Sequence, residues 1–137
     1  MTIPRRPALL ACLALAAPAA RAQGTTGPSG AWVVQAIGTT SQAGAPRADI
    51  TFAADGRAHG TTGCNRFNGG FTVDGASLTF GPVAGTRMAC EPRAMDQERR
   101  FHEALAATRG WRMDGQALLL TDAAGTPVLR LIRIRAG

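Results

Sequence analysis

The residue types in this chain that most readily carry chemistry are cysteine and histidine. Cys64 lies five residues after His59, and a cysteine becomes a nucleophile when a neighbouring base removes its proton. Cys64, Cys90, His59 and His102 also offer the ligand types of a zinc site. The two cysteines lie far apart along the chain, and so do the two histidines, whereas common zinc motifs contain closely spaced Cys or His pairs. We therefore expect no metal, no cofactor and no catalytic residue, and interpret both histidines as surface residues.

The N-terminal segment decides the compartment in which the cysteines reside. Residues 1–22 carry Arg5 and Arg6 near their start, continue through an apolar run and end in Ala20-Arg21-Ala22. This is the pattern of a secretory signal peptide with its cleavage site. The apolar run is shorter than the roughly 18 residues needed to span a bilayer. We expect an exported chain, periplasmic or associated with the cell envelope, whose mature form has no transmembrane anchor.

A second interpretation of the same segment involves Cys12. The run Leu9-Leu10-Ala11-Cys12 resembles a lipoprotein cleavage site, at which the cysteine becomes acylated. Cleavage there would leave almost no apolar core before the cysteine and an apolar stretch after it, so we favour ordinary cleavage after residue 22. The mature chain then keeps Cys64 and Cys90, and an even pair in an oxidising compartment predicts a disulfide.

Removal of residues 1–22 also changes what the charge implies. The full chain of 137 residues has a formal net charge of +6, and its basic residues are all arginine. The remaining 115 residues carry +3, because three arginines leave with the signal peptide. The other arginines are scattered and lack the aromatic neighbours of a single-stranded nucleic-acid site. We therefore expect no nucleic-acid partner.

The elements that must position these residues are short strands and one helix. Residues 23–30 are rich in Gly, Thr, Pro and Ser, which predicts a flexible leader before a single domain at 31–135. The fold class is mainly β (α+β): a small antiparallel, barrel-like β domain with one amphipathic helix. Strands are expected at residues 32–37, 48–52, 57–61, 71–73, 77–80, 111–113, 117–121 and 128–134, and the helix at 93–108.

Two details concern the ends of these elements. The expected helix stops before Gly110, which would act as its C-cap. In the last strand the apolar residues fall out of phase with a strict alternation. A β-bulge between Leu131 and Ile132 would bring all of them to the inner face.

Glu98 is expected within the apolar stripe of the helix, alongside Phe101 and Leu105. A carboxylate in that position needs a partner. One hypothesis is an acid that faces a cavity and transfers a proton. The other is an anchor that holds the helix to the loop at 65–68 or to Arg87. We favour the anchor, because buried charges are normally paired.

Residues 63–71 contain several glycines and two asparagines, which predicts a structured loop rather than a regular strand. Asn65, Arg66, Asn68 and Arg87 could form a polar binding patch, since loops on a rigid β scaffold often carry recognition. The same residues could instead serve the turn, with asparagine in left-handed geometry and arginine over apolar surface. The sequence leaves both interpretations open.

A series of motifs in fixed order covers residues 32–134. They are Trp32, Ile50-Thr51-Phe52 with Asp55-Gly56, Gly63-Cys64-Asn65-Arg66-Phe67, Thr86-Arg87-Met88-Ala89-Cys90, the helix residues Glu98, Phe101 and Leu105, and Leu118-Leu119-Leu120. Together they resemble the META domain, the family of the bacterial heat-shock protein HslJ. The resemblance implies one antiparallel, barrel-like β domain with one helix, exported or envelope-associated, with no known reaction. Phe71 stands where the family often has tyrosine, which removes a phenol.

These observations together predict a non-enzymatic exported protein of the META family. We expect it to support cell-envelope integrity or a stress response by binding an unknown envelope protein, lipid or small ligand, as a monomer. One alternative is a secreted protease inhibitor, for which small size and a rigid loop are suitable. Another is a hydrolase, which is less favoured because the common hydrolase motifs are absent from the sequence.

Overall fold

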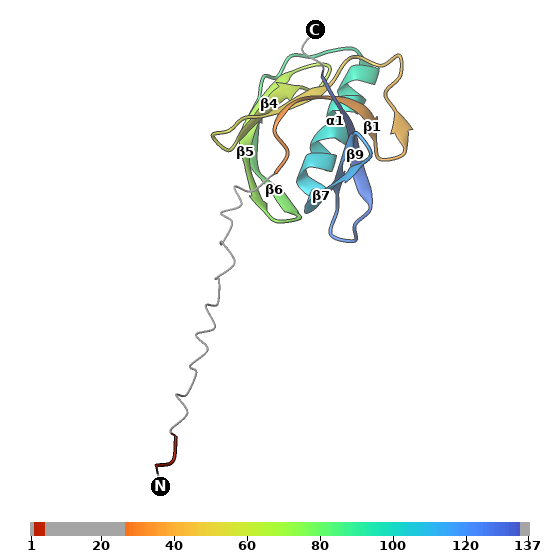
Figure 1. Ribbon diagram of the computed structural model, residues 1–137. Coiled ribbons are helices and arrows are strands. Elements are labelled where there is room, and N and C mark those ends of the chain that lie inside the picture. The colour runs from red at the N-terminus through yellow and green to blue at the C-terminus, as the bar shows by residue number, and fades with distance from the viewer. Residues whose placement is uncertain (1, 5–26, 135–137) are drawn as a thin grey trace.

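The computed structural model describes residues 2–4 and 27–134. Within them, nine antiparallel strands form one sheet in the order β2-β1-β3-β4-β5-β6-β7-β8-β9, and β1 also pairs with β9, which closes the sheet into a ring (Figure 1). The strands are β1 (Gly30–Ile37), β2 (Thr40–Ser41), β3 (Asp49–Phe52), β4 (Arg57–Thr61), β5 (Arg66–Asp74), β6 (Ser77–Gly85), β7 (Gly110–Asp114), β8 (Ala117–Thr121) and β9 (Pro127–Arg133). The mainly β fold with one helix confirms the predicted class.

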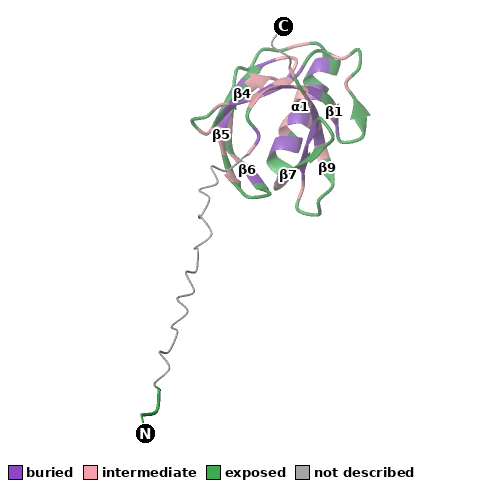
Figure 2. Cartoon of the chain, viewed as in Figure 1, coloured by how far each residue is buried: buried purple, intermediate pink, exposed green. Residues whose placement is uncertain are grey.

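The helix, α1 (Pro92–Ala107), lies against the inner side of the sheet, between β6 and the β1–β9 pair (Figure 1). Pro92 occupies the first helical turn, where its missing N–H costs nothing. The helix buries one stripe that contains Ala94, Phe101 and Leu105. Buried residues alternate with more exposed ones along strands such as β3 and the first half of β5, whereas all five residues of β8 are buried. Buried residues of the sheet and the helix face one another (Figure 2).

The core runs through the ring and is made of aromatic and aliphatic side chains. Its largest fully buried members are Trp32, Phe52, Phe101, Ile50, Leu78, Leu105, Leu118, Leu120, Leu129 and Leu131. Phe67 contributes from β5 and packs 5.2 Å from the Phe101 ring, centroid to centroid. This contact joins the helix to the strand that carries the candidate site.

The predicted loop at residues 63–71 is wrong over most of its length. The irregular turn ends at Asn65, and β5 begins at Arg66. Its glycines permit close strand pairing rather than a loop: a Cβ added at Gly69 would lie 2.9 Å from the Pro82 carbonyl oxygen of β6. The strand alternates regularly, with Phe67 inside and Arg66 outside.

The bulge predicted between Leu131 and Ile132 is also wrong. Leu131 pairs with Val34 and Ile132 with Val33 in unbroken register, so Ile132 stays on the outer face and is partly exposed. The register shift is in β1, where Gln35 is the extra residue. A bulge in β1 leaves the in–out alternation of β9 unchanged. The periodicity of apolar residues in β9 therefore cannot reveal it.

The helix ends differently from the prediction. Its cap is Thr108, whose hydroxyl donates to the Ala104 carbonyl at 2.8 Å, and Gly110 already belongs to β7. A Cβ at Gly110 would lie 2.9 Å from Oγ1 of Thr121, so close strand packing explains this glycine.

Most of the predicted leader segments lie outside the described residues. This holds for the signal peptide at 1–22 apart from residues 2–4, for Cys12, and for residues 23–26. Gly30 belongs to β1, and Pro28 is buried beside it. No helix among the described residues is long and apolar enough to cross a membrane.

Candidate functional site

Asn65 is the centre of the motif-bearing region and is 97% buried. Its Oδ1 accepts hydrogen bonds from the Met88 backbone N–H at 2.7 Å and from the Thr86 hydroxyl at 2.9 Å. Its Nδ2 donates to the Met88 carbonyl at 3.1 Å and to Oε2 of Glu98 at 3.2 Å. One side chain therefore ties the turn before β5 to the segment after β6 and to the helix.

Glu98 lies on α1 and faces this turn. Its Oε1 accepts a 2.9 Å hydrogen bond from the Thr62 hydroxyl, and its Oε2 accepts the bond from Asn65. The Thr62 Oγ1 in turn accepts from the Asn65 backbone N–H at 2.9 Å. Glu98 is thus placed where an anchor to the 65–68 segment requires it, and its partners are Thr62 and Asn65 rather than Arg87. We call Thr62, Asn65, Thr86 and Glu98 the polar network.

Gln97 adds a second connection between the helix and the same turn. It is 98% buried, and its Nε2 donates 2.8 Å hydrogen bonds to the carbonyls of Pro46 and Thr62. Gly63 has a φ of +96°, and a Cβ there would clash with Nε2 of Gln97. The turn thus requires glycine at 63. Gln97 lies one helical turn before the buried Phe101, a spacing that marks it in the sequence as inward-facing.

A disulfide joins Cys64 and Cys90, as predicted, with a Cα–Cα distance of 6.0 Å. It covers the outer end of the polar network. Two methionines lie at this end: Met95 Sδ is 3.8 Å from Sγ of Cys64 and accepts the Cys90 backbone N–H at 3.4 Å. The Met88 carbonyl oxygen lies 3.5 Å from the same Cys64 sulfur. We call Cys64, Cys90, Met88 and Met95 the sulfur corner.

The other residues of the predicted patch point outward. Arg66 and Asn68 are exposed on β5, and Arg87 is exposed after β6. Asn68 Oδ1 accepts a 2.7 Å hydrogen bond from Arg57 of β4. The five candidates therefore separate, with Asn65 and Glu98 in the polar network and the other three on the surface. In the described chain only glycines have positive φ, so Asn65 does not adopt the left-handed geometry considered for it.

The two histidines lie apart from the disulfide. His59 is exposed on β4, opposite Asn68 in the strand register. His102 is partly buried on α1 with its ring edge-on to Phe67 and Phe101. Among residues 2–4 and 27–134 there is no group of three His, Cys, Asp or Glu side chains that could hold a metal ion.

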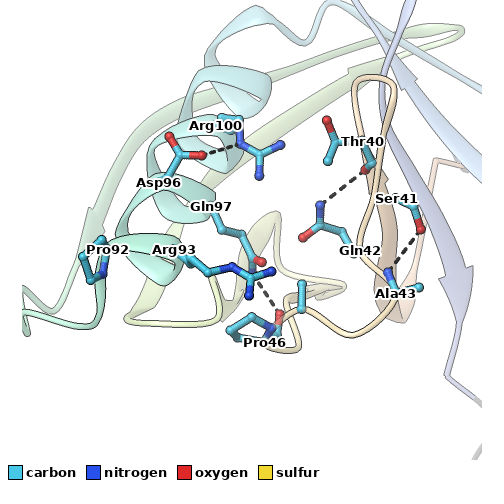
Figure 3. Close-up of a pocket in the computed structure, with 11 residues that line it drawn as sticks. Thr40, Ser41, Gln42, Ala43, Pro46, Pro92, Arg93, Asp96, Gln97 and Arg100 are labelled. Atoms are coloured by element: carbon cyan, nitrogen blue, oxygen red, sulfur yellow. Dashed lines mark hydrogen bonds and ion pairs between the residues drawn. The ribbon is translucent and has the colours of Figure 1, made fainter.

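Figure 3 shows a pocket of about 330 Å³ between the loop at 40–46 and the first half of α1. Gln42 and Arg93 extend into it from the two sides, while Asp96 holds the Arg100 guanidinium at 3.1 Å. Oε1 of Gln42 is buried and has no hydrogen-bond donor among the described residues. We call this the loop–helix pocket.

A larger groove of about 570 Å³ lies between β6 and the second half of α1. Phe80, Val83 and Leu105 form its apolar floor, and His102 and Arg109 lie at its edges. The Arg109 Nη1 is fixed by hydrogen bonds to the carbonyls of Ala106 at 2.9 Å and Thr108 at 2.7 Å. We call this the β6–α1 groove.

The family model of the META domain matches residues 25–133. The chain belongs to the META domain family. Three solved structures share its fold with TM-scores near 0.6. One is an NMR structure of a protein from Burkholderia xenovorans, with TM-score 0.61 and 27% identity over 77% of this chain and 82% of that one. Another is a crystal structure of a DUF4847 family protein from Bacteroides vulgatus, with TM-score 0.59 and 18% identity over 80% and 95%. No curated protein matches.

The motifs that suggested the META domain converge in space. Residues 63–67, residues 86–90 and Glu98 are far apart in the sequence, and the polar network and the disulfide bring them together. Phe71, which replaces the frequent tyrosine, packs edge-on against Phe52 with centroids 5.1 Å apart. In this META domain Asn65, Glu98 and the disulfide hold the turn, the helix and the segment after β6 in fixed positions, while Arg66 and Arg87 of the same motifs are exposed.

Proposed function

We propose that this META domain protein is exported and acts without catalysis, supporting envelope integrity or stress tolerance by binding an amphipathic anion in the β6–α1 groove. The observation that carries the proposal is an apolar groove of about 570 Å³ beside a guanidinium that the backbone already holds in place. Ligand sites commonly have volumes of about 300–1,000 Å³ and combine apolar walls with a few fixed polar groups.

The groove matches one kind of ligand, a fatty acid or a similar lipid anion. Phe80 and Val83 are partly exposed there and offer surface to an acyl chain. Arg109 uses one of its nitrogens on the two carbonyls, which leaves further N–H donors for a carboxylate. Because the guanidinium is already positioned, binding costs little additional side-chain entropy.

Export is supported by the signal-peptide pattern and by the disulfide. A covalent Cys64–Cys90 bond persists in oxidising compartments and is rare in the cytosol. The absence of catalysis is inferred from how the motif residues are used: the acid Glu98 is occupied by Thr62 and Asn65. We therefore assign the polar network to structure and the groove to binding.

Titration with dodecanoate, followed by calorimetry and by NMR chemical shifts, tests the ligand. We expect binding at the groove, with loss of binding in Ala106→Trp, which fills it, and at least tenfold weaker binding in Arg109→Gln. The matched control is Ala43→Trp, which fills the loop–helix pocket instead and should bind normally. No binding, or binding that Ala106→Trp leaves intact, would contradict the proposed site.

A cellular test addresses the role. A strain that lacks the protein should be more sensitive to heat or detergent, and the wild-type chain should restore tolerance while Ala106→Trp should not. Mixing the protein with periplasmic proteases tests the alternative of a secreted inhibitor. Slowed hydrolysis would favour the inhibitor, for which the exposed face of β4 and β5 around Arg66 and Asn68 is the surface to mutate.

A further inference from the structure

Sulfur atoms are concentrated at one place on this molecule. Five sulfur-bearing residues follow residue 22, and four of them form the sulfur corner, whereas Met113 lies on β7. Met95 Sδ is 3.8 Å from Sγ of Cys64, and Cys64 is bonded to Cys90. Three sulfurs, from the turn at 64, the segment before α1 and α1 itself, are thus close together, and the Met88 carbonyl oxygen lies 3.5 Å from Cys64 Sγ.

The methionines of this corner are not core residues. Met88 is 59% exposed and Met95 is 39% exposed, although apolar side chains of this size are usually buried. Met95 is held in place by the Cys90 N–H, which points at its sulfur. The Met95 thioether, held beside two cysteine sulfurs and partly open to solvent, makes with them a set of three soft ligands.

We propose that, when the Cys64–Cys90 disulfide is reduced, the sulfur corner binds one Cu(I) ion through the two cysteine thiolates and the Met95 thioether. Met88, whose carbonyl oxygen lies 3.5 Å from Cys64 Sγ, brings a further thioether to the same segment. Thiolate and thioether ligands together select Cu(I) among the biological first-row metals. The proposal is independent of the β6–α1 groove, which lies at the other end of α1.

The chemistry has two steps. A dithiol reductant transfers two electrons and two protons to the disulfide, so the S–S bond breaks, two thiols form, and the reductant becomes a disulfide. Cu(I) then replaces the two thiol protons, which go to solvent, and its oxidation state does not change. Within the second step no oxidant or further reductant is consumed.

The geometry suits a single ion. A bond from a first-row metal to sulfur is about 2.3 Å long, so two sulfurs bound to one ion lie up to about 4.6 Å apart. The 3.8 Å between Cys64 Sγ and Met95 Sδ falls inside this limit without movement of the helix. Asn65 Nδ2 lies 3.3 Å from Sγ of Cys64 and can donate to the thiolate by exchanging its hydrogen bond to the Met88 carbonyl, which would support the ligand from the second layer.

Zinc is a poorer occupant of this corner. Zinc sites use cysteine, histidine and carboxylate ligands, and no group of three such residues exists in the described chain. Two thiolates and one or two thioethers are too soft a set for it.

An anaerobic competition experiment tests the proposal. Residues 23–137, which include every described strand and the helix, are reduced with a phosphine and titrated with Cu(I) against bicinchoninate. We expect one Cu(I) per chain in the reduced form and none retained by the disulfide form. Met95→Leu should weaken binding at least tenfold, whereas Met113→Leu, the matched control on β7, should leave the affinity unchanged.

X-ray absorption on the copper-loaded chain gives an independent measurement. We expect at least three sulfur ligands in the wild type and one fewer in Met95→Leu. Equal affinities of the wild type and Met95→Leu would overturn the proposal, since any reduced dithiol, folded or not, would then explain the binding. A two-sulfur coordination shell in the wild type would overturn it as well.

Discussion

Asn65 shows how much one buried amide can organise. Its oxygen accepts from Met88 and Thr86, and its nitrogen donates to the Met88 carbonyl and to Glu98. Both ends of the amide are therefore used, which fixes its orientation. A hydrogen bond contributes about 1 kcal/mol net, but a buried partner left without one costs about 1–3 kcal/mol. Asn65 therefore contributes to stability mainly because its partners would be buried without a hydrogen bond if it were removed.

Asn65→Ala is accordingly expected to lower the free energy of unfolding by about 3 kcal/mol, since the Met88 N–H and one oxygen of Glu98 lose a buried partner. Denaturant unfolding measures the change. The matched control is Asn68→Ala, three residues along the same segment, where an exposed amide contacts only Arg57 and the loss should stay within about 0.5 kcal/mol. Similar losses in the two variants would show that the polar network contributes little.

At the scale of elements, side chains of the helix α1 bond directly to the turn between β4 and β5. Gln97 and Glu98 are consecutive residues of α1, and both bond to Thr62 in that turn. The left-handed Gly63 lets the chain pass beside the Gln97 amide. The helix is thus fixed by side chains that reach backbone and turn, in addition to its apolar stripe.

Two glycine substitutions separate the free-energy cost of a clash with Gln97 from the cost of a non-glycine residue at positive φ. Gly63→Ala adds both a methyl group that clashes with Gln97 and a residue with positive φ, whereas Gly75→Ala adds only the positive φ, because nothing lies within 4 Å of its Cβ position. We expect a loss of about 1 kcal/mol in Gly75→Ala and a loss larger by about 2 kcal/mol in Gly63→Ala. Equal losses in urea unfolding would mean that Gln97 moves aside freely.

The exposed side of α1 predicts a dependence on pH. The hydrogen bond from Arg99 lowers the pKa of Asp96 below its usual value of 3.8, with Arg100 acting in the same direction. A lowered folded-state pKa gives stability that is present above the unfolded-state value and is lost as pH falls through the folded-state value.

The melting temperature of the wild type should therefore exceed that of Asp96→Asn near neutral pH, and the two should converge as the pH falls below about 3.8. Melting curves between pH 2 and 7 measure the difference. It should shrink in 1 M salt, which screens exposed charges. A difference that is constant over the whole range would assign the effect of the substitution to helix propensity.

Strong local signals in the sequence predicted most elements, and pairing between strands explains the errors. The strands expected at 48–52 and 57–61, and at 71–73 and 77–80, are present, and the turns that join each pair have Gly56 and Gly75 at positive φ, as tight turns require. Glu98 is half-buried next to the buried stripe of α1 and bonds to Thr62 and Asn65. The first half of β5, residues 66–70, was missed because Gly69 serves the close approach of β6 on the neighbouring strand. The bulge at Gln35 was missed because it lies in β1, whereas the irregular pattern was seen in β9.

At the scale of the whole molecule, two closures hold the domain together. The first is the pairing of β1 with β9, which carries the Arg133 guanidinium to 4.4 Å above the Trp32 ring. The second is the disulfide, which links residues 26 positions apart and ties the turn before β5 to the segment before α1. One closure is made of hydrogen bonds and packing, and the other is covalent.

Removal of the disulfide should destabilise the domain without unfolding it. A cross-link over a loop of this length stabilises by about 3.5 kcal/mol in the chain-entropy model. We expect the Cys64→Ser/Cys90→Ser variant to lose about that amount and to melt at a lower temperature, while dodecanoate binding by the folded domain stays largely intact. Reduced wild-type protein serves as the control and should melt like the variant. Coincident melting of oxidised and reduced wild type would contradict the prediction.

The pairing of the first strand with the last also sets the order in which the chain can assemble during synthesis. A polypeptide that emerges from its N-terminus exposes β1 early, yet its partner β9 ends only at Arg133. The β5–β6 hairpin and the disulfide can form while the ring is still open, because all of their residues lie between 64 and 90. We therefore expect an early, cross-linked intermediate whose unpaired β1 edge is the part most exposed to aggregation, and completion only when the last strand is free.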